Sequence, residues 1–149
     1  MVELEEITGR NYRQCCSLKV SEKQINNRSV ASNVAILARA YAYRTQGGCA
    51  YAISNAQEMV GLLMYRNLDD PPACYILDQF MIDARFQGRG YGKAALMLLA
   101  EKLRGEKKYA KIELGCSRDN TAAMKFYQRC GFYFSGDDSE DEIGMAFDL

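Results

Sequence analysis

The stretch QGRGYGK, residues 87–93, places three glycines at alternate positions between two regular segments. Before it lies the mostly apolar run Cys74–Asp83, which predicts a central strand covered on both faces. After it, from Gly90 or Tyr91 to about Glu106, apolar residues recur along one side, which predicts an amphipathic helix. Such a strand–loop–helix junction directs backbone N–H groups and the positive end of a helix toward one point. It therefore favours binding of a phosphate.

Two common phosphate-binding loops do not match this stretch. The dinucleotide fingerprint requires a glycine three positions beyond Gly90, where the chain has Lys93. The P-loop requires Ser or Thr after Gly92-Lys93, where the chain has Ala94. A flexible glycine-rich turn before a helix is the alternative interpretation. The loop alone predicts only that the protein binds a phosphorylated molecule.

The composition is that of a soluble globular protein, and we expect residues 1–149 to form one domain. The 19 basic and 19 acidic side chains cancel, so no overall field attracts nucleic acid or an anionic membrane. No apolar run is long enough to span a bilayer. The acidic start of the chain is unlike a signal peptide. We expect a cytoplasmic protein that binds neither nucleic acid nor membrane.

Cysteine and histidine usage restricts the chemistry. The six cysteines, at positions 15, 16, 49, 74, 116 and 130, show no C-x-x-C spacing, and the chain contains no histidine. A chain of this size needs no disulfide scaffold, so we expect reduced thiols and no metal site. Hydrolases with a Ser-His-Asp or Cys-His arrangement are excluded in their usual form. A catalytic base must be Asp, Glu, Tyr, Lys or water.

The order of the predicted elements indicates a mixed α/β (α+β) layer structure. The expected strands are Val2–Ile7, Cys49–Ser54, Met59–Arg66, Cys74–Asp83, Lys111–Cys116, Phe132–Gly136 and Ile143–Phe147. Besides the helix after the glycine loop, the expected helices are Thr8 (as N-cap) to about Val20, one from Val30 with Val34, Leu37 and Tyr41 on one face, and Asn120–Cys130. Gln24–Ser29 is expected to be irregular, and Gly131 to end the last helix.

A second motif lies in the last predicted helix. Asn120, Ala123 and Tyr127 stand at i, i+3 and i+7, ahead of Gly131-Phe132. Together, Q-x-x-G-x-G from Gln87 and N-x-x-A-x-x-x-Y-x-x-x-G-F from Asn120 resemble the GNAT superfamily of N-acetyltransferases. The resemblance covers the whole chain. It implies a GNAT fold, with a twisted, mixed but mostly antiparallel sheet of about six to seven strands flanked by about four helices.

The resemblance implies acetyl-CoA as the cofactor. In the family the corresponding loop wraps the pyrophosphate of CoA with backbone amides, and the residues implied here are Gln87, Gly88, Arg89, Gly90, Tyr91, Gly92 and Lys93. The strand before the loop splays from its neighbour, so backbone groups near Met81 and Ile82 would meet the pantetheine arm and the acetyl carbonyl. Asn120, Ala123 and Tyr127 would border the cofactor from the other side.

Tyr127 and Asp78 are the candidate catalytic residues. The resemblance implies that Tyr127 protonates the leaving thiolate, although its stripe with Ala123 and Phe126 alone favours a core residue. The acceptor must also lose a proton, because an aliphatic ammonium has a pKa near 10. Asp78 is the candidate base, since it aligns with the strand glutamate that serves as base in spermidine/spermine acetyltransferases. A structural carboxylate is the alternative, and Asp83 is a weaker candidate.

The acceptor is implied by a narrower resemblance. Leu77–Asp83 and Val30–Val34 are similar to segments of bacterial spermine/spermidine or diamine acetyltransferases, which implies a small polyamine or diamine substrate. Those relatives usually have an aromatic residue just before the position of Val30, where this chain has Ser29. Acidic groups that could receive a polycation are Glu22, Asp69, Asp70, Asp78 and the cluster 137–142. A solvated hairpin tip is the alternative for that cluster.

Other functions stay open. A GNAT enzyme could act on an aminoglycoside, an amino acid, or a protein lysine or N-terminus. The chain could instead be a non-catalytic acyl-CoA-binding module or a phosphate-binding regulatory domain. The presence of both Tyr127 and Asp78 argues against the module, and the failed fingerprints argue against the regulatory domain. Since dimers are common among similar proteins, a homodimer is compatible with the sequence.

Overall fold

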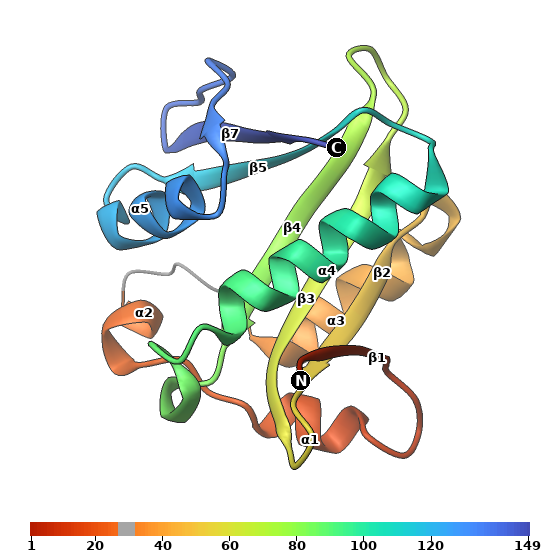
Figure 1. Cartoon of the computed structure of the whole chain (residues 1–149), viewed down its shortest axis with the longest axis vertical. Helices are drawn as coiled ribbons and strands as arrows, with labels where there is room; N and C mark the ends of the chain where they lie inside the picture. The colour runs from red at the N-terminus through yellow and green to blue at the C-terminus, as the bar shows by residue number, and fades with distance from the viewer. Residues whose placement is uncertain (27–31) are drawn as a thin grey trace.

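The computed structural model describes residues 1–26 and 32–149. Its centre is a seven-stranded sheet in the order β1-β2-β3-β4-β5-β7-β6 (Figure 1). The strands are β1 (Glu3–Glu6), β2 (Cys49–Ser54), β3 (Met59–Leu68), β4 (Cys74–Ile82), β5 (Lys111–Ser117), β6 (Tyr133–Phe134) and β7 (Glu142–Asp148). Strands β4 and β5 pair in parallel, and the other neighbours pair antiparallel. The predicted mixed, mostly antiparallel sheet is confirmed.

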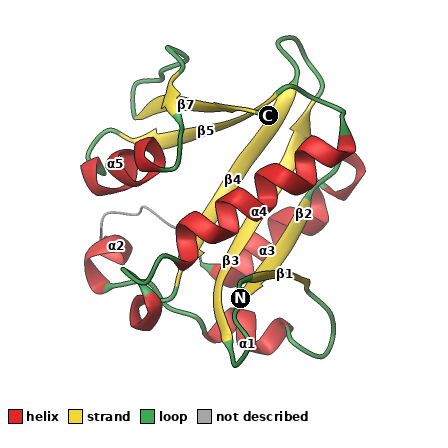
Figure 2. Cartoon of the chain, in the orientation of Figure 1, coloured by secondary structure: helices red, strands yellow, loops and turns green. Residues whose placement is uncertain are grey.

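Helices cover both faces of the sheet (Figure 2). Helix α4 (Tyr91–Glu106) crosses one face, with α5 (Thr121–Arg129) beside it over β5 and β7. Helix α3 (Asn33–Ala42) lies on the opposite face, together with the short α1 (Tyr12–Ser17). The short α2 (Glu22–Asn26) brings the α-helices in the described residues to five, one more than the sequence predicts.

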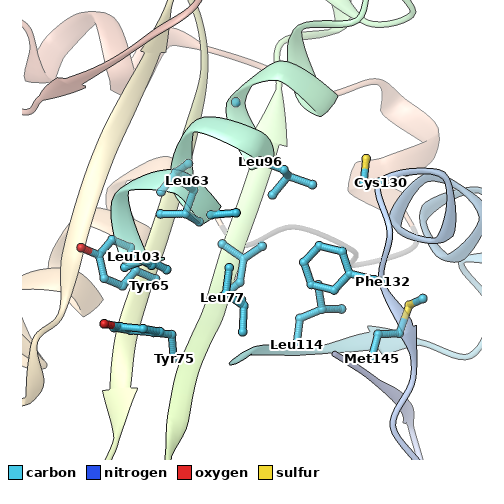
Figure 3. Packing of buried hydrophobic residues seen from close by; sticks show 14 of the residues in the cluster. Leu63, Tyr65, Tyr75, Leu77, Leu96, Leu103, Leu114, Cys130, Phe132 and Met145 are labelled. Carbon is cyan, nitrogen blue, oxygen red and sulfur yellow. The ribbon is translucent and has the colours of Figure 1, made fainter. Parts of the chain in front are cut away.

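The two faces bury separate cores. The core under α4 and α5 includes Leu63, Leu77, Leu96, Leu114, Phe132 and Met145 (Figure 3). The core under α3 includes Cys15, Ile36, Leu62, Met64 and Met81. Because side chains alternate along a strand, Leu63 of β3 faces the first core while Leu62 and Met64 face the second. This double burial accounts for the unbroken apolar runs in the central strands.

The first predicted helix is wrong in length and cap. Instead of a helix from Thr8 to Val20, the chain turns between Thr8 and Asn11 before the short α1 begins. The Thr8 hydroxyl accepts a hydrogen bond from the Arg10 N–H at 3.2 Å, and the Thr8 N–H donates to the Asn11 side chain at 2.8 Å. These local bonds give the backbone an alternative to a helical turn.

The segment between α1 and α3 is partly helical. Gln24–Ser29, predicted as irregular, begins inside α2, and its last three residues lie outside the described part. Val30, the predicted start of the next helix, also lies outside it. Helix α3 begins at Asn33, because the Ser32 side chain accepts a hydrogen bond from the Ala35 N–H at 3.2 Å and caps the helix.

Helix α3 turns a different face to the core from the predicted one. Val34 and Tyr41, predicted on the buried face, are 61% and 68% exposed, whereas Leu37, predicted on the same face, is partly buried against the core. The buried positions are Asn33, Ile36 and Ala40. The Asn33 side-chain amide donates to the carbonyls of Cys15, at 2.7 Å, and Leu18, at 2.9 Å. These bonds satisfy carbonyls at the end of α1, and they set the rotation of α3.

The remaining elements lie within a few residues of their predicted positions. Strand β4 ends at Ile82, one residue before the predicted Asp83, and β6 is shorter than the predicted Phe132–Gly136. The six cysteines are free. Among the helices of the described residues, none has the length and apolarity needed to cross a membrane.

Candidate functional site

Strands β4 and β5 diverge soon after they meet (Figure 1). Within the described residues they pair at Tyr75↔Ile112 and Ile76↔Glu113 alone, although β4 continues to Ile82. From Leu77 onward, the edge of β4 that faces β5 therefore lacks a strand partner. Backbone groups on this open edge are available to a ligand.

Phe80 and Ile82 direct their backbone groups to the open edge. The Asp83 N–H donates to the Val60 carbonyl of β3 at 2.8 Å. Residues of an antiparallel ladder alternate between bonding the neighbouring strand and pointing away from it. The N–H groups of Ile82 and Phe80 therefore point away from β3. Met81 lies between them and bonds toward β3, so of the two predicted backbone contacts Ile82 lies at the open edge and Met81 does not.

The glycine loop follows the end of β4 and leads into α4. Gly88 and Gly90 have positive φ angles, 75° and 83°, and Gly90 occupies the N-cap position of α4. A Cβ at either position would meet no other atom within 4 Å. These glycines are thus required by backbone conformation, and the space outside the loop is free. An anion there would face the first N–H groups of α4.

Gly92 has a different role in the loop. A Cβ at this position would lie 3.0 Å from Cζ of Phe126 and 3.6 Å from Cγ1 of Ile82. The missing side chain therefore allows the start of α4 to pack closely on α5 and on the end of β4. This contact joins the two sequence motifs.

Among the polar side chains of the loop, one is hydrogen-bonded within the protein and two are exposed cations. Gln87 Nε2 donates to the Ile82 carbonyl at 2.8 Å and to Gln24 Oε1 at 2.9 Å, which ties the loop to β4 and α2. Arg89 and Lys93 are exposed. They add positive charge where the helix terminus already favours an anion.

Tyr91 and Asn120 have partners within the protein. The Tyr91 hydroxyl accepts a hydrogen bond from Asn55 Nδ2 at 3.2 Å. The Asn120 side chain accepts one from the Ala123 N–H at 3.1 Å and caps α5. Ala123 is partly buried against the core under α4 and α5. Each of these predicted cofactor contacts thus also has a structural role.

Tyr127 lies in an aromatic cluster that joins α5 to β4. Its ring centroid is 6.5 Å from that of Phe80, 5.3 Å from Phe126 and 5.5 Å from Phe132. Burial raises the pKa of the Tyr127 phenol, so it stays protonated at neutral pH. Because Phe80 points its backbone to the open edge of β4, an uncharged proton donor stands beside that edge.

Asp78 is an ion-paired carboxylate on the α3 face. The register of β3 and β4 shifts at this residue, which marks a β-bulge. Its Oδ2 lies 3.1 Å from Nε of Arg39 and 2.8 Å from Nε of Arg66. Two guanidinium groups around one carboxylate give the cluster a net positive charge. Because Asp78 is ion-paired in this arrangement, an acceptor amine would have to compete with the arginines to reach it.

Asp83 anchors the chain before α2 to the end of β4. It is 2% exposed and accepts hydrogen bonds from the N–H groups of Lys19 and Arg85, both at 3.0 Å, and from Arg85 Nε at 2.8 Å. Burial alone would raise the pKa of Asp83, but the hydrogen bonds from Arg85 and Lys19 outweigh it and hold the pKa below its usual value.

An acidic pocket of about 200 Å³ lies where β4 and β5 part. Its lining includes Ile76, Glu113, Ser135, Asp137, Ser139 and Glu142. Glu113 alternates with Ile112 and Leu114, which face the core under α4 and α5, so the pocket opens on the opposite face. Part of the acidic cluster 137–142 thus lines a pocket.

Arg118 holds the acidic loop in place. Its Nε donates to the Glu140 carbonyl at 3.1 Å and its Nη2 to the Ser139 carbonyl at 2.9 Å.

The other acidic groups predicted to receive a polycation lie away from this pocket. Asp69 pairs with Lys108 at 3.4 Å, and Asp69 and Asp70 follow β3 at the end of the sheet away from the glycine loop. Glu22 is exposed on α2.

Known proteins are similar to this chain in sequence. Residues 12–132 match the model of the acetyltransferase (GNAT) family. The spermine/spermidine N(1)-acetyltransferase of Bacillus subtilis is 29% identical over 141 residues, which cover 91% of this chain and 90% of the relative.

Solved structures share the fold. A GNAT-family acetyltransferase from Staphylococcus aureus superposes with a TM-score of 0.75 at 18% identity, covering 100% of this chain and 99% of the other. The PaiA N-acetyltransferase of Thermoplasma acidophilum, solved with coenzyme A, gives a TM-score of 0.73 at 16% identity and the same coverage.

Proposed function

The chain belongs to the acetyltransferase (GNAT) family, whose members use acetyl-CoA, and we propose that it acetylates a primary amine of a polyamine such as spermidine or spermine. One observation carries the choice of acceptor: the acidic pocket at the point where β4 and β5 diverge. Among its carboxylates, Glu113 is paired with Lys111 at 2.7 Å, so Asp137 and Glu142 would receive the ammonium groups of a polycation. The B. subtilis relative, named for the same substrates, supports the choice.

The described residues fit acetyl-CoA. The open outer side of the glycine loop and the first N–H groups of α4 would hold the pyrophosphate, with Arg89 and Lys93 adding charge. The N–H groups of Phe80 and Ile82 would bind the pantetheine arm and the acetyl carbonyl along the open edge of β4. Acetyl-CoA supplies an activated acyl group and a thiolate leaving group.

Two side chains would transfer protons during the reaction. The Tyr127 phenol, kept protonated because burial raises its pKa, would donate its proton from Oη to the leaving sulfur. Asp78 would meet the ammonium of the acceptor on the other face of the sheet and accept its proton. The neutral amine forms the new C–N bond as the C–S bond breaks, so the acetyl group passes directly from the thioester to the acceptor without a covalent enzyme intermediate.

The spacing along β4 suits a polyamine. Ile76 lines the acidic pocket, and Asp78 lies two residues further on the same face, a separation of about 7 Å. A chain of three or four methylenes can span this distance. One ammonium of the acceptor could then occupy the pocket while the reacting amine lies at Asp78.

A panel of acceptors tests the proposal. With acetyl-CoA present, we expect spermidine and spermine to be acetylated more efficiently than amino acids, aminoglycosides or a peptide with a free N-terminus. Product mass should be followed by mass spectrometry, because the six cysteines would react with a thiol dye. Turnover of another class in preference to polyamines would contradict the proposed acceptor.

The acidic pocket gives a sharper test in the same assay. Asp137→Asn removes a charge that lines the pocket, so we expect the KM for spermidine to rise about threefold to tenfold. Glu140→Gln is the matched control, because Glu140 lies in the same loop and is exposed outside the pocket lining. Equal effects of the two variants on the KM for spermidine would mean that the overall charge of the loop, and not the pocket, determines binding of the acceptor.

Gly90→Ala tests the cofactor loop. A Cβ at a φ of 83° strains the loop by about 1–2 kcal/mol, so we expect the Kd for acetyl-CoA, measured by isothermal titration, to rise about tenfold. Gly105→Ala is the matched control. Gly105 lies inside α4, and a Cβ there meets no other atom within 4 Å. An unchanged Kd for Gly90→Ala would place the cofactor phosphates elsewhere.

A further inference from the structure

Resting on the proposed function, we propose that Arg39 occupies the cation subsite of the acceptor site, and that the acceptor's ammonium must displace it from Asp78. Arg39 would then weaken the binding of every acceptor amine that must reach Asp78, so that only an acceptor also held in the acidic pocket binds well.

The surroundings of the Arg39 guanidinium are those of a cation site. Its Nε lies 3.1 Å from Asp78 Oδ2, and its Nη2 lies 3.5 Å from Oδ1. The guanidinium carbon is 5.2 Å from the centroid of the Tyr43 ring. A carboxylate beside an aromatic face is a combination that also binds an ammonium group. An acceptor cation could therefore replace Arg39 contact for contact.

The two arginines at Asp78 differ in how firmly they are held. Arg66 lies on the neighbouring strand β3, its Nε is 2.8 Å from Asp78, and its side chain is 20% exposed. Arg39 reaches across from α3, with a longer distance of 3.1 Å and a side chain that is 44% exposed. Exposed ion pairs contribute little stability. Arg39 is thus the partner that can swing into solvent at small cost.

Asp78 also lies at the right place along β4. Two residues before it, Ile76 lines the acidic pocket, and two residues after it, Phe80 presents its backbone to the open edge. The Arg39 contact therefore lies between the pocket for a distal ammonium and the edge proposed for the acetyl group.

The displacement penalty makes the second contact, in the acidic pocket, necessary for tight binding of an acceptor. With both arginines in place the cluster at Asp78 is net positive, so a single ammonium gains little by replacing Arg39. An acceptor whose distal ammonium is held in the acidic pocket presents its reacting amine to Asp78 at a high effective concentration. Both acceptors incur the same penalty for displacing Arg39, and the contact in the pocket offsets that penalty for the polycation alone.

The test compares Arg39→Gln with Arg39→Lys and Arg44→Gln. Arg44 follows α3 on the chain, but its guanidinium contacts the Tyr41 ring and carbonyl rather than Asp78. For Arg39→Gln we expect the KM for spermidine to fall about threefold to fivefold, with kcat unchanged. The KM for a monoamine of similar length should fall by the same factor, because the penalty for displacing Arg39 is common to both acceptors. Arg39→Lys should restore the wild-type values, and Arg44→Gln should match wild type.

The outcomes separate the two proposals. If spermidine is a substrate and Arg39→Gln leaves its KM unchanged or raises it, displacement is wrong while the proposed function stands. A raised KM restored by Arg39→Lys would indicate that Arg39 binds the acceptor directly. If neither the wild-type protein nor Arg39→Gln acetylates spermidine, the proposed acceptor is wrong, and so is the displacement of Arg39. Thermal unfolding of each variant confirms that the comparison is made between folded proteins.

Discussion

Replacing Tyr127 with phenylalanine is expected to lower kcat by about a hundredfold, because general acids contribute at least that much to proton transfer. The ring keeps its packing against Phe80 and Phe126, so the fold and the KM for acetyl-CoA should change little. Only the proton donor is lost. Steady-state kinetics with spermidine, followed by product mass, measures the effect.

Tyr133→Phe is the matched control for this prediction. Tyr133 is 45% exposed on β6, and its hydroxyl donates to Asp148 at 2.8 Å, at the far edge of the sheet. We expect kcat to stay at the wild-type value. If Tyr127→Phe is as active as Tyr133→Phe, the Tyr127 hydroxyl is not the acid, and its place in the aromatic cluster is purely structural.

Asp83→Ala is expected to lower the free energy of unfolding by about 2–3 kcal/mol, since the N–H groups of Lys19 and Arg85 lose their buried acceptor. For a chain of this size the Tm should fall by roughly 6–10 °C. Thermal and urea unfolding measure both quantities. Asp119→Ala, at an exposed turn position, is the control and should leave the Tm unchanged.

The same carboxylate predicts a pH dependence. The hydrogen bonds hold the pKa of Asp83 below its usual value in the folded protein, so its contribution is complete above the pKa of an unfolded Asp, about 4. The contribution is lost as the pH falls below that value through the lowered folded pKa. The stability difference between wild type and Asp83→Asn should therefore shrink below about pH 4. A constant difference in that range would contradict the assignment.

Local signals explain which parts of the fold could be predicted. The glycine loop, α4 and α5 depend on periodicity and on capping residues within a few positions, and Asn120 and Gly131 mark the ends of α5 closely. The face of α3 depends on Asn33, which bonds carbonyls 18 and 15 residues away. The spacing of apolar residues along a helix does not indicate that a polar residue is buried when its hydrogen-bond partners come from another helix.

The same limit applies to the candidate site. The two motifs indicated the cofactor loop and Tyr127, but the choice between Met81 and Ile82 depends on the phase of the ladder with β3. The partners of Asp78 are 39 and 12 residues away, and neither arginine belongs to a recognisable motif. Their presence changes Asp78 from a free carboxylate to a paired one, which no local pattern indicates.

Hydrogen–deuterium exchange with and without acetyl-CoA tests the central claim most directly, because the proposed contacts are backbone N–H groups. We predict slower exchange at Phe80, Ile82 and residues 87–93 when acetyl-CoA is added. Spermidine added together with CoA should then slow exchange in residues 135–144, and the turn at 69–73 should not change. Unchanged exchange across residues 80–93, with protection elsewhere on the chain, would contradict an acetyl-CoA site between β4 and β5.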